Sequence, residues 1–459
     1  MHKHTVADMV YRKIRTRLSA LDGRTLTVVK NTAATAVMKA GVLACSLIMV
    51  PITLDYLNAE NYGIWMAMTS VLYWFAFFDV GLGNGMRNYM AEAISCRDYD
   101  KARSYFSTSL FLLSLIAVIM GTISLLSVFC LDLRQIFNTH IMENNELAVV
   151  MSVAIIFSLV QFVAKNVGMV YVAMQKYAMN DFIIFIGQVT SAAVIYIITR
   201  TTEPNLIYIV SVITGIPALV FILASVPLVR KHPWLRPGIR NVDMTSAKKI
   251  AGKGLGFFLI QITSCLVIFG SANILISHYC GPEQVTVYNI SYKLFNILII
   301  VYTIILSPLW NAYTDAAVKG DYEWIRRIFR KSVLLWLVSV AMGIIVLPMS
   351  GWFFTKWVGG SVEIPMGVSV SVLAYVCMFN FNNCVTYLIN GLNKIKVQII
   401  TSVTGTAAYL AAVCLFIKGD YGIYGISVSM CAVYLLMALV HLYQCRLLAN
   451  NRAHGIWNE

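Results

Sequence analysis

The sequence predicts an all-α polytopic membrane protein with about twelve transmembrane helices, arranged as two pseudo-symmetric six-helix bundles around a central cavity. Three observations support this fold class: long apolar blocks, an internal repeat and a one-sided distribution of basic residues. The chain has 459 residues, of which 59% are hydrophobic and 12% are charged. Because a soluble domain carries about a quarter charged residues, the composition indicates a membrane protein.

Twelve apolar blocks approach or exceed the roughly 20 residues that a helix needs to cross a bilayer. The blocks are long and uninterrupted, which favours helices over the alternating pattern of barrel strands. We expect spans at approximately residues 32–54, 62–88, 104–131, 147–173, 181–199, 205–229, 254–279, 286–310, 330–350, 364–390, 397–417 and 422–445.

The two halves of the chain repeat each other. A constant shift of 223 residues superposes Asn88 on Asn311, Asp98-Tyr99 on Asp321-Tyr322, Arg103 on Arg326, Tyr56 on Tyr279 and Lys30 on Lys253. A repeat of this length across membrane spans is typical of a transporter with two related halves.

The longest polar interruption divides the chain after the sixth span. We therefore expect a basic N-terminal segment (1–31), an N-terminal lobe (32–229), a linker (230–253), a C-terminal lobe (254–445) and a tail (446–459). Residues 1–31 contain no short apolar core followed by a small-residue cleavage site, so we expect the first span to stay uncleaved.

The basic residues predict the orientation of the chain in its membrane. If both termini are cytoplasmic, the inner segments hold 27 Lys and Arg residues, whereas the outer loops hold only Arg134, Arg200, Lys356 and Lys418. The positive-inside rule then favours cytoplasmic termini. This bias explains the net charge of +14 without a nucleic-acid partner, and we expect none.

Motifs for metal or nucleotide chemistry are missing from the sequence. The ten cysteines are scattered, mostly within spans, and form no Cys-x-x-Cys, so they resemble small buried hydrophobes rather than a metal site or a disulfide framework. There is no phosphate-binding Gly-x-x-x-x-Gly-Lys-Ser/Thr. We expect no metal and no cofactor, apart from a coupling H⁺ or Na⁺.

Four cations lie within the predicted spans or at their inner edges: Lys39, Arg87, Lys165 and Lys293. An ionisable group in hydrocarbon is costly unless it faces a cavity or a partner. One interpretation is a water-filled central cavity whose positive walls suit an anionic substrate. The alternatives are that each long side chain reaches the nearest interface, or pairs with a carboxylate.

Of the carboxylates in the sequence, only Asp79 lies well inside a predicted span. Asp79, Gly83 and Arg87 are spaced i, i+4, i+8, so they would lie near one face of a continuous helix. We weigh two roles for Asp79: binding of a coupling proton or Na⁺, and a structural pair with Arg87 or Lys39.

Four segments resemble a known family. They are NAENYGIW (58–65), FFDVGLGNGMRNYMAEA (77–93), VYNISYKLF (287–295) and SPLWNAYTDAAVKGDYEWIRRIFRK (307–331). They resemble Wzx-type O-antigen and capsule flippases, in the polysaccharide branch of the multidrug/oligosaccharidyl-lipid/polysaccharide (MOP) exporter superfamily. The similarity covers both halves of the chain, and the last segment is the most specific.

The resemblance implies two bundles that face a V-shaped cavity and move undecaprenyl-pyrophosphate-linked oligosaccharide from the inner to the outer leaflet of the bacterial inner membrane by alternating access. It also implies that cavity cations hold the pyrophosphate, for which Lys39, Arg87, Lys165 and Lys293 are the candidates, and that a cation gradient drives the cycle. Expected partners are the lipid-linked oligosaccharide, membrane lipids, a polysaccharide polymerase and a chain-length regulator. Asparagines in the seventh, eighth and tenth spans would meet sugar hydroxyls or hydrogen-bond neighbouring helices.

Two other functions remain as alternatives. A cation-coupled multidrug antiporter of the same superfamily would favour acidic cavity residues, whereas this chain has four embedded cations against one embedded carboxylate. A membrane polysaccharide polymerase or ligase would need a sizeable outer loop for catalysis. The predicted outer loops are short, so we do not expect an enzyme.

Overall fold

The computed structural model describes residues 23–79, 82–251, 270–418 and 422–459. The regular elements in these ranges are helices. The N-terminal lobe contains α2 (Gly23–Phe75), η1 (Ala76–Asp79), α3 (Leu82–Ser95), α4 (Tyr99–Cys130), α5 (Leu133–Phe137), α6 (Asn144–Ala164), α7 (Asn166–Ala173), α8 (Tyr177–Thr201), α9 (Leu206–Lys231), η2 (Pro233–Leu235), η3 (Ile239–Asn241) and α10 (Met244–Ala251).

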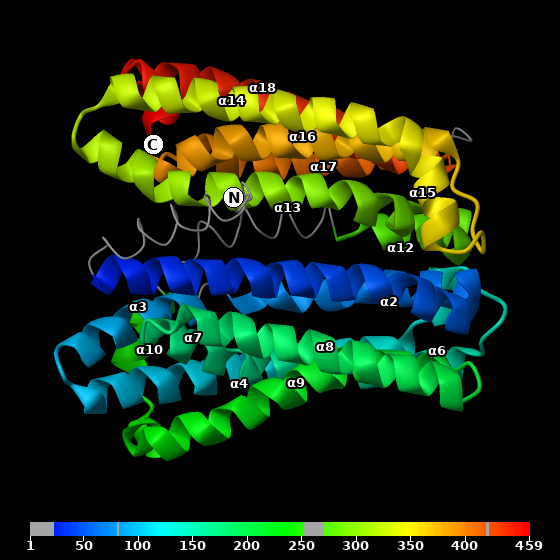
Figure 1. Ribbon diagram of the computed structural model, residues 1–459, viewed down its shortest axis with the longest axis horizontal. Helices are drawn as coiled ribbons and strands as arrows, with labels where there is room; N and C mark the ends of the chain where they lie inside the picture. The colour runs from blue at the N-terminus through cyan, green and yellow to red at the C-terminus, as the bar shows by residue number, and fades with distance from the viewer. Residues whose placement is uncertain (1–22, 80–81, 252–269, 419–421) are drawn as a thin grey trace, which may run out of the picture.

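The C-terminal lobe lies beside it (Figure 1). It contains α12 (Ala272–Cys280), α13 (Pro282–Val318), α14 (Tyr322–Val346), η5 (Leu347–Met349), α15 (Ser350–Trp357), α16 (Met366–Gly391), α17 (Lys396–Lys418), α18 (Gly422–Ala449) and η6 (Gly455–Asn458).

The described residues contain ten helices that are long and apolar enough to cross a membrane. One of them is α2, which at 53 residues would be about 80 Å long if straight. It bends sharply at Asn58, which has the non-helical φ/ψ of 65° and 173°, and thus provides two of the predicted spans. Most of the predicted span 254–279 lies outside the described residues.

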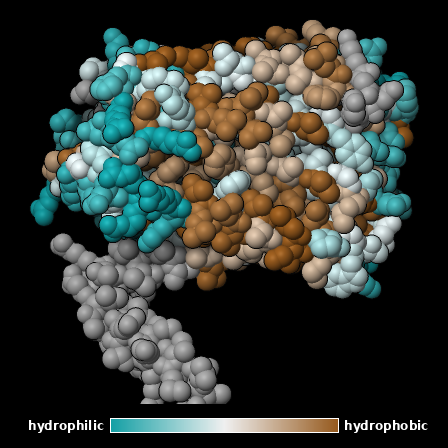
Figure 2. Space-filling model, turned by 90° about the horizontal axis from the view of Figure 1, so that it is seen from above, coloured by the Kyte–Doolittle hydropathy of each residue, from teal (hydrophilic) through white to brown (hydrophobic). Residues whose placement is uncertain are grey.

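The bend defines one end of the molecule, which we call the Asn58 end. There Tyr56 Oη lies 2.8 Å from Thr202 Oγ1, at the end of α8. The opposite end, where the exposed Lys231, Lys319 and Lys331 lie, we call the basic end. Figure 2 shows a hydrophobic band between two hydrophilic ends, as expected of a protein embedded in a bilayer.

The internal repeat is visible in the backbone. Under the shift of 223 residues, the bend at Asn58 corresponds to Gly281, which separates α12 from α13 with a φ of 90°. Arg97 and Gly320 also correspond, and both have positive φ. The next residues, Asp98 and Asp321, cap α4 and α14 by accepting from Lys101 N and Trp324 N, which satisfies free N–H groups of the first helical turn.

Equivalent arginines fasten the end of each lobe. Arg103 Nε donates to the carbonyl oxygen of Arg236 at 2.7 Å, in the segment after α9. Its repeat partner Arg326 donates through Nη1 to the carbonyl oxygen of Ala449 at 3.0 Å, at the end of α18. The repeat therefore preserves a tertiary contact as well as a helix boundary.

Each lobe has its own core. In the N-terminal lobe, Ile64, Trp65 and Met68 of α2 pack with residues of α6 and α9. In the C-terminal lobe, Tyr375, Tyr409 and Tyr434 contribute to a core from α16, α17 and α18. These separate cores allow the lobes to act as two bodies.

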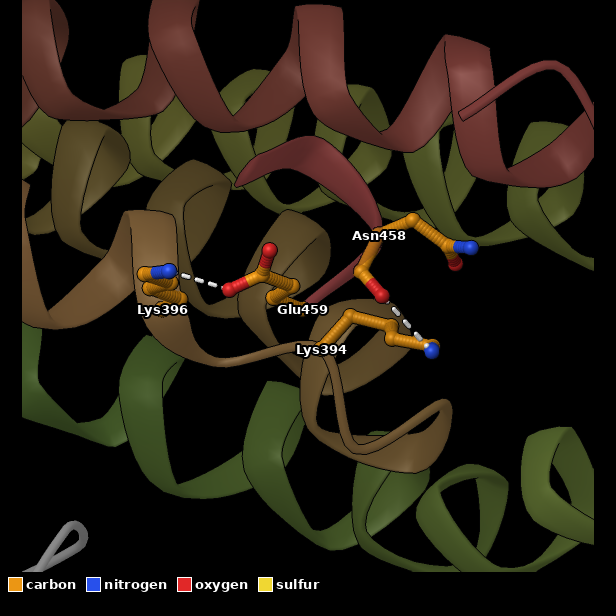
Figure 3. A network of polar contacts seen from close by, with 4 residues as sticks. All are labelled: Lys394, Lys396, Asn458 and Glu459. Carbon is orange, nitrogen blue, oxygen red and sulfur yellow. Dashed lines mark hydrogen bonds and ion pairs between the residues drawn. The ribbon is translucent and has the colours of Figure 1, made fainter. Parts of the chain in front are cut away.

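The C-terminal residues dock on the basic end of the C-terminal lobe (Figure 3). Lys394 Nζ donates to the carbonyl oxygen of Asn458 at 2.8 Å, and Lys396 forms an ion pair with Glu459. Trp457 packs edge-on against Tyr443 of α18, with ring centroids 5.0 Å apart. Part of the predicted tail is thus held against α17 and α18.

Candidate functional site

Hydrogen bonds join the two lobes at the Asn58 end. Thr286 Oγ1 donates to the carbonyl oxygen of Ala59 at 2.6 Å, and Ser277 Oγ donates to that of Phe137 at 2.7 Å. Further inter-lobe bonds run from Asn273 to Met66, from Trp357 to Leu47, and between His278 and Gln135. The inter-lobe hydrogen bonds found among the described residues all lie in the half of the molecule nearer this end.

Apolar packing reinforces this junction. Val50, Leu54 and Tyr62 of α2 form one buried cluster with Ile290, Phe354 and Val358 of the other lobe. Close approach is possible because Gly63 has no side chain: a Cβ there would lie 1.7 Å from the carbonyl oxygen of Pro282. The lobes are therefore latched together at the Asn58 end.

An inter-lobe pocket of about 310 Å³ lies beside the latch. Lys293 of α13 is one of its lining residues. Its Nζ donates to Tyr62 Oη at 3.3 Å and lies 6.0 Å from the centre of the Tyr62 ring. The aromatic face and the hydroxyl both favour the ammonium group, so Lys293 touches the opposite lobe from within the pocket.

A second pocket of about 380 Å³ lies in the N-terminal lobe. Asp79 and Lys165 both line it. This N-lobe pocket shares four wall residues with the inter-lobe pocket: Trp65, Thr69, Tyr73 and Ile213. The two pockets therefore adjoin each other, with Lys165 in the wall of one and Lys293, on the other lobe, in the wall of the other.

The helix break between α6 and α7 falls at Lys165. The next residue, Asn166, is buried, and its Nδ2 donates to Ser109 Oγ of α4 at 2.8 Å. Its Oδ1 is buried without a hydrogen-bond partner among the described residues. Lys165 itself is exposed within the N-lobe pocket, so its charge faces open space rather than the core.

Asp79 lies at the end of η1, and the predicted continuous helix over 62–88 was wrong. The span consists of α2, η1 and α3, so Asp79 and Arg87 belong to different elements. Asp79 Oδ1 accepts from the backbone N of Gly83 at 2.9 Å. The ion pairs found among the described residues are Lys101–Asp98, Lys319–Asp315 and Lys396–Glu459, and none of these three includes Asp79. Both proposed roles of Asp79 therefore stay predictions.

The other two candidate cations lie elsewhere. Arg87 donates through Nε and Nη2 to its neighbour Asn88 Oδ1, at 3.2 and 3.1 Å. Lys39 is exposed on the first half of α2. Neither lines the inter-lobe or the N-lobe pocket, so of the predicted site residues the structure brings Lys165, Lys293 and Asp79 to these two pockets.

Sequence reasoning missed several polar residues of the cavity. They are Tyr62, Gln188, Gln161 and Asn166. Of the predicted amides, Asn273 and Asn289 hydrogen-bond each other at 2.9 Å in the wall of the inter-lobe pocket. The position of Asn166 directly after an embedded lysine was a signal that could have been used, whereas the Tyr62–Lys293 contact spans 231 residues and left none.

The sequence was compared with known proteins. No family model matches it. A Salmonella typhi protein named as an O-antigen transporter is 20% identical over 356 residues, which cover 76% of this chain and 80% of the relative. A Salmonella typhimurium protein of the same name is 21% identical, covering 75% and 79%. A Yersinia pseudotuberculosis protein named as an O-antigen export protein is 23% identical, covering 63% and 66%.

Solved structures share the fold. An inward-facing multidrug resistance MATE family transporter of the MOP superfamily has a TM-score of 0.74 at 15% identity, covering 90% of this chain and 95% of that one. An outward-facing transporter of that description gives 0.62 at 13% identity, covering 92% and 96%. A Pyrococcus furiosus MOP superfamily transporter, described as having a binding pocket of reverse polarity, gives 0.53 at 14%, covering 91% and 97%.

The two lobes and the pocket between them have the architecture of the MATE/MOP transporters. Within that class, the resemblance to the polysaccharide branch is confirmed, since the three sequence relatives above are named for O-antigen transport or export. The expectation of a transporter rather than an enzyme agrees with these relatives, each of which is named for transport or export.

Proposed function

We propose that the protein flips an undecaprenyl-pyrophosphate-linked oligosaccharide from the inner to the outer leaflet of the bacterial inner membrane. The observation that carries this proposal is the pair of adjoining pockets, one lined by Lys165 and the other by Lys293 of the opposite lobe. Two lysines in a low-dielectric site suit the concentrated negative charge of a pyrophosphate. The names of the O-antigen relatives support the same substrate class.

Alternating access is part of the proposal. With the basic end in the cytoplasm, as the charge bias favours, the latched Asn58 end is the outer end. The described conformation is then the inward-facing one, ready to receive substrate from the cytoplasmic leaflet. Opening the latch while the basic ends of the lobes approach each other would expose the same lysines to the outside.

Asp79 is the proposed site of cation coupling. It lines the same pocket as Lys165, so a proton or Na⁺ bound there changes the net charge that the pyrophosphate meets. The substrate and the driving ion would thereby influence each other's binding. A polysaccharide polymerase and a chain-length regulator are the proposed downstream partners.

Gene deletion tests the function. We expect the deletion strain to lose its surface polysaccharide and to accumulate the lipid-linked repeat unit on the cytoplasmic leaflet. A strain that displays the polymer normally, and in which no second flippase is found, would overturn the proposal.

A multidrug antiporter is the second candidate, favoured by the carboxylate of Asp79 in the N-lobe pocket and by the names of the MATE structures. It predicts proton- or Na⁺-driven efflux of organic cations and unchanged polysaccharide in the deletion strain. Measurement of cation uptake into proteoliposomes containing the purified protein separates the two functions.

A further inference from the structure

The two lobes differ in how closely their helices pack at one pair of repeat-related positions. In the C-terminal lobe, a Cβ on Gly343 of α14 would lie 3.2 Å from Leu298 Cδ1 of α13 and 2.5 Å from Leu373 Cδ1. The space between these helices is therefore filled. The shift of 223 residues carries Gly343 to Met120 and Leu298 to Phe75, and these two residues line an open groove.

This apolar groove has a volume of about 600 Å³. Its walls come from the end of α2, η1, α4, α5 and α6, and include Trp74, Phe75, Met120, Ile123 and Phe137. Ile119 and Ile123 are 50% and 61% exposed, so the groove opens at the surface of the lobe. Among its few polar atoms is Ser127 Oγ, which already donates to the Ile123 carbonyl oxygen.

The groove lies next to the polar cavity. Phe75 lines both the groove and the N-lobe pocket that contains Lys165 and Asp79. Phe75 thus borders both a polar pocket inside the lobe, which contains Lys165, and an apolar groove at its surface. A molecule with an anionic head and a long hydrocarbon chain matches this pair of sites.

The size of the groove also suits a hydrocarbon chain. Its lining positions on α4 run from Ile116 to Val128, which corresponds to about 18 Å along the helix. This exceeds half of the roughly 30 Å hydrocarbon core of a bilayer. A chain in the groove would therefore be held over about the depth of one leaflet.

We propose that this groove binds the polyprenyl chain of the lipid-linked substrate while its pyrophosphate occupies the cavity beside Lys165. The proposal rests on the proposed function and assigns the lipid portion of the substrate a site in the N-terminal lobe alone. Because lipid tails are as apolar as the groove, binding depends on close packing rather than on escape from water. We therefore expect the shape of the groove to favour a branched, unsaturated chain. Straight acyl chains should compete only weakly for the same site.

Photochemical labelling tests the groove in the intact protein. The purified protein is placed in nanodiscs with a polyprenyl diphosphate that carries a diazirine in its chain. A parallel sample contains a phosphatidylethanolamine with a diazirine in its acyl chain at the same mole fraction. We expect the polyprenyl probe to label α4 at least fivefold more than the phospholipid probe, as read by mass spectrometry of the peptides. Equal labelling by the two probes would identify a general lipid surface and overturn the proposal.

Two matched variants on α4 locate the label. Ile123 and Val118 are similarly exposed, at 61% and 64%, but only Ile123 lines the groove. Ile123→Trp should reduce polyprenyl labelling at least fivefold, whereas Val118→Trp should leave it unchanged. Met120→Trp, deeper in the groove, should act like Ile123→Trp. If both Ile123→Trp and Met120→Trp leave labelling unchanged in folded protein, the chain binds elsewhere.

The labelling result is separate from the test of function. If export depends on the protein but the probe shows no preference for α4, the groove proposal fails and the flippase stands. If labelling is selective while the deletion strain exports polymer normally without a second flippase, the flippase proposal fails.

Discussion

Lys165 and Lys293 reach the cavity in different ways. Lys293 is half-buried and touches Tyr62 of the opposite lobe, whereas Lys165 lies exposed at a helix break within the N-terminal lobe. An anion that binds Lys293 competes with Tyr62 for the ammonium group. Substrate binding at this residue would thereby weaken a contact of the latch.

Replacement of the two lysines tests the anion site. We expect Lys165→Ala and Lys293→Ala each to reduce export about tenfold or more, since a hydrogen bond to a charged group contributes about 1.5–3 kcal/mol. Arginine should be tolerated better because the positive charge is kept. The measurement is flipping of lipid-linked oligosaccharide in proteoliposomes, normalised to protein amount, with the exposed Lys356→Ala as the matched control.

The same assay separates the cavity from interfacial positions. Lys39→Ala impairs export only if the substrate also meets the exposed first half of α2, and Arg87→Ala only if it meets α3. A defect that follows protein abundance in all four alanine variants would indicate that the lysines and the arginine reach the interface and do not bind substrate.

Asp79→Asn tests ion coupling. An asparagine side chain can still accept the hydrogen bond from Gly83 N, because Asn caps a helix start as well as Asp does. We therefore expect normal abundance but slower transport with an altered dependence on pH or Na⁺. Unchanged ion dependence together with low abundance would show that Asp79 is a structural partner of a cation, and removal of that cation should then restore abundance.

At the scale of elements, breaks in the helices position the site. The bend at Asn58 returns the chain through the membrane and places Gly63 against Pro282. The end of α2 at Phe75 and the short η1 bring Asp79 to the pocket. The break between α6 and α7 does the same for Lys165.

Gly63→Ala should open the latch. The new methyl group would meet the Pro282 carbonyl oxygen at 1.7 Å, which is far inside van der Waals contact, so the lobes must separate at the Asn58 end. We expect spin labels at Asn138 and Lys356 to move apart in electron-resonance distance measurements. Gly351→Ala is the control, since a Cβ there meets no atom within 4 Å. An unchanged distance in folded Gly63→Ala protein contradicts the latch.

At the scale of the whole molecule, the distribution of charge predicts how the protein lies in the membrane. The hydrophobic band in Figure 2 separates the basic end from the Asn58 end. Lys and Arg are retained on the cytoplasmic side of bacterial membranes. The basic end is therefore expected to face the cytoplasm, which makes the latch the outer gate.

Reporter fusions test this topology. We expect fusions at Asn138 and Lys356 to report an external location, because Asn138 follows α5 and Lys356 lies in the short helix α15, both at the Asn58 end. A fusion at Pro237, between α9 and α10, should report a cytoplasmic location. An external signal at Pro237 would reverse the orientation and make the described conformation outward-facing.

The sequence by itself determined the helical membrane fold and the approximate limits of the long spans that the structure describes, because a bilayer requires about 20 apolar residues from each helix. It also determined the repeat: Asp98 and Asp321 occupy equivalent caps because helix starts follow local sequence. The same local rules failed for 62–88, where η1 divides the predicted helix. Apolarity alone does not distinguish a straight helix from one with a break.

Only the tertiary structure decided which charges share a cavity. Lys39, Arg87, Lys165 and Lys293 look alike in the sequence, since each is a cation in or beside an apolar block. Their surroundings depend on contacts between distant residues, as Tyr62 and Lys293 show. The groove beside Phe75 depends in the same way on the distance between two packed helices. A linear pattern specifies which residues the membrane tolerates, but the packing of the helices decides what each residue faces.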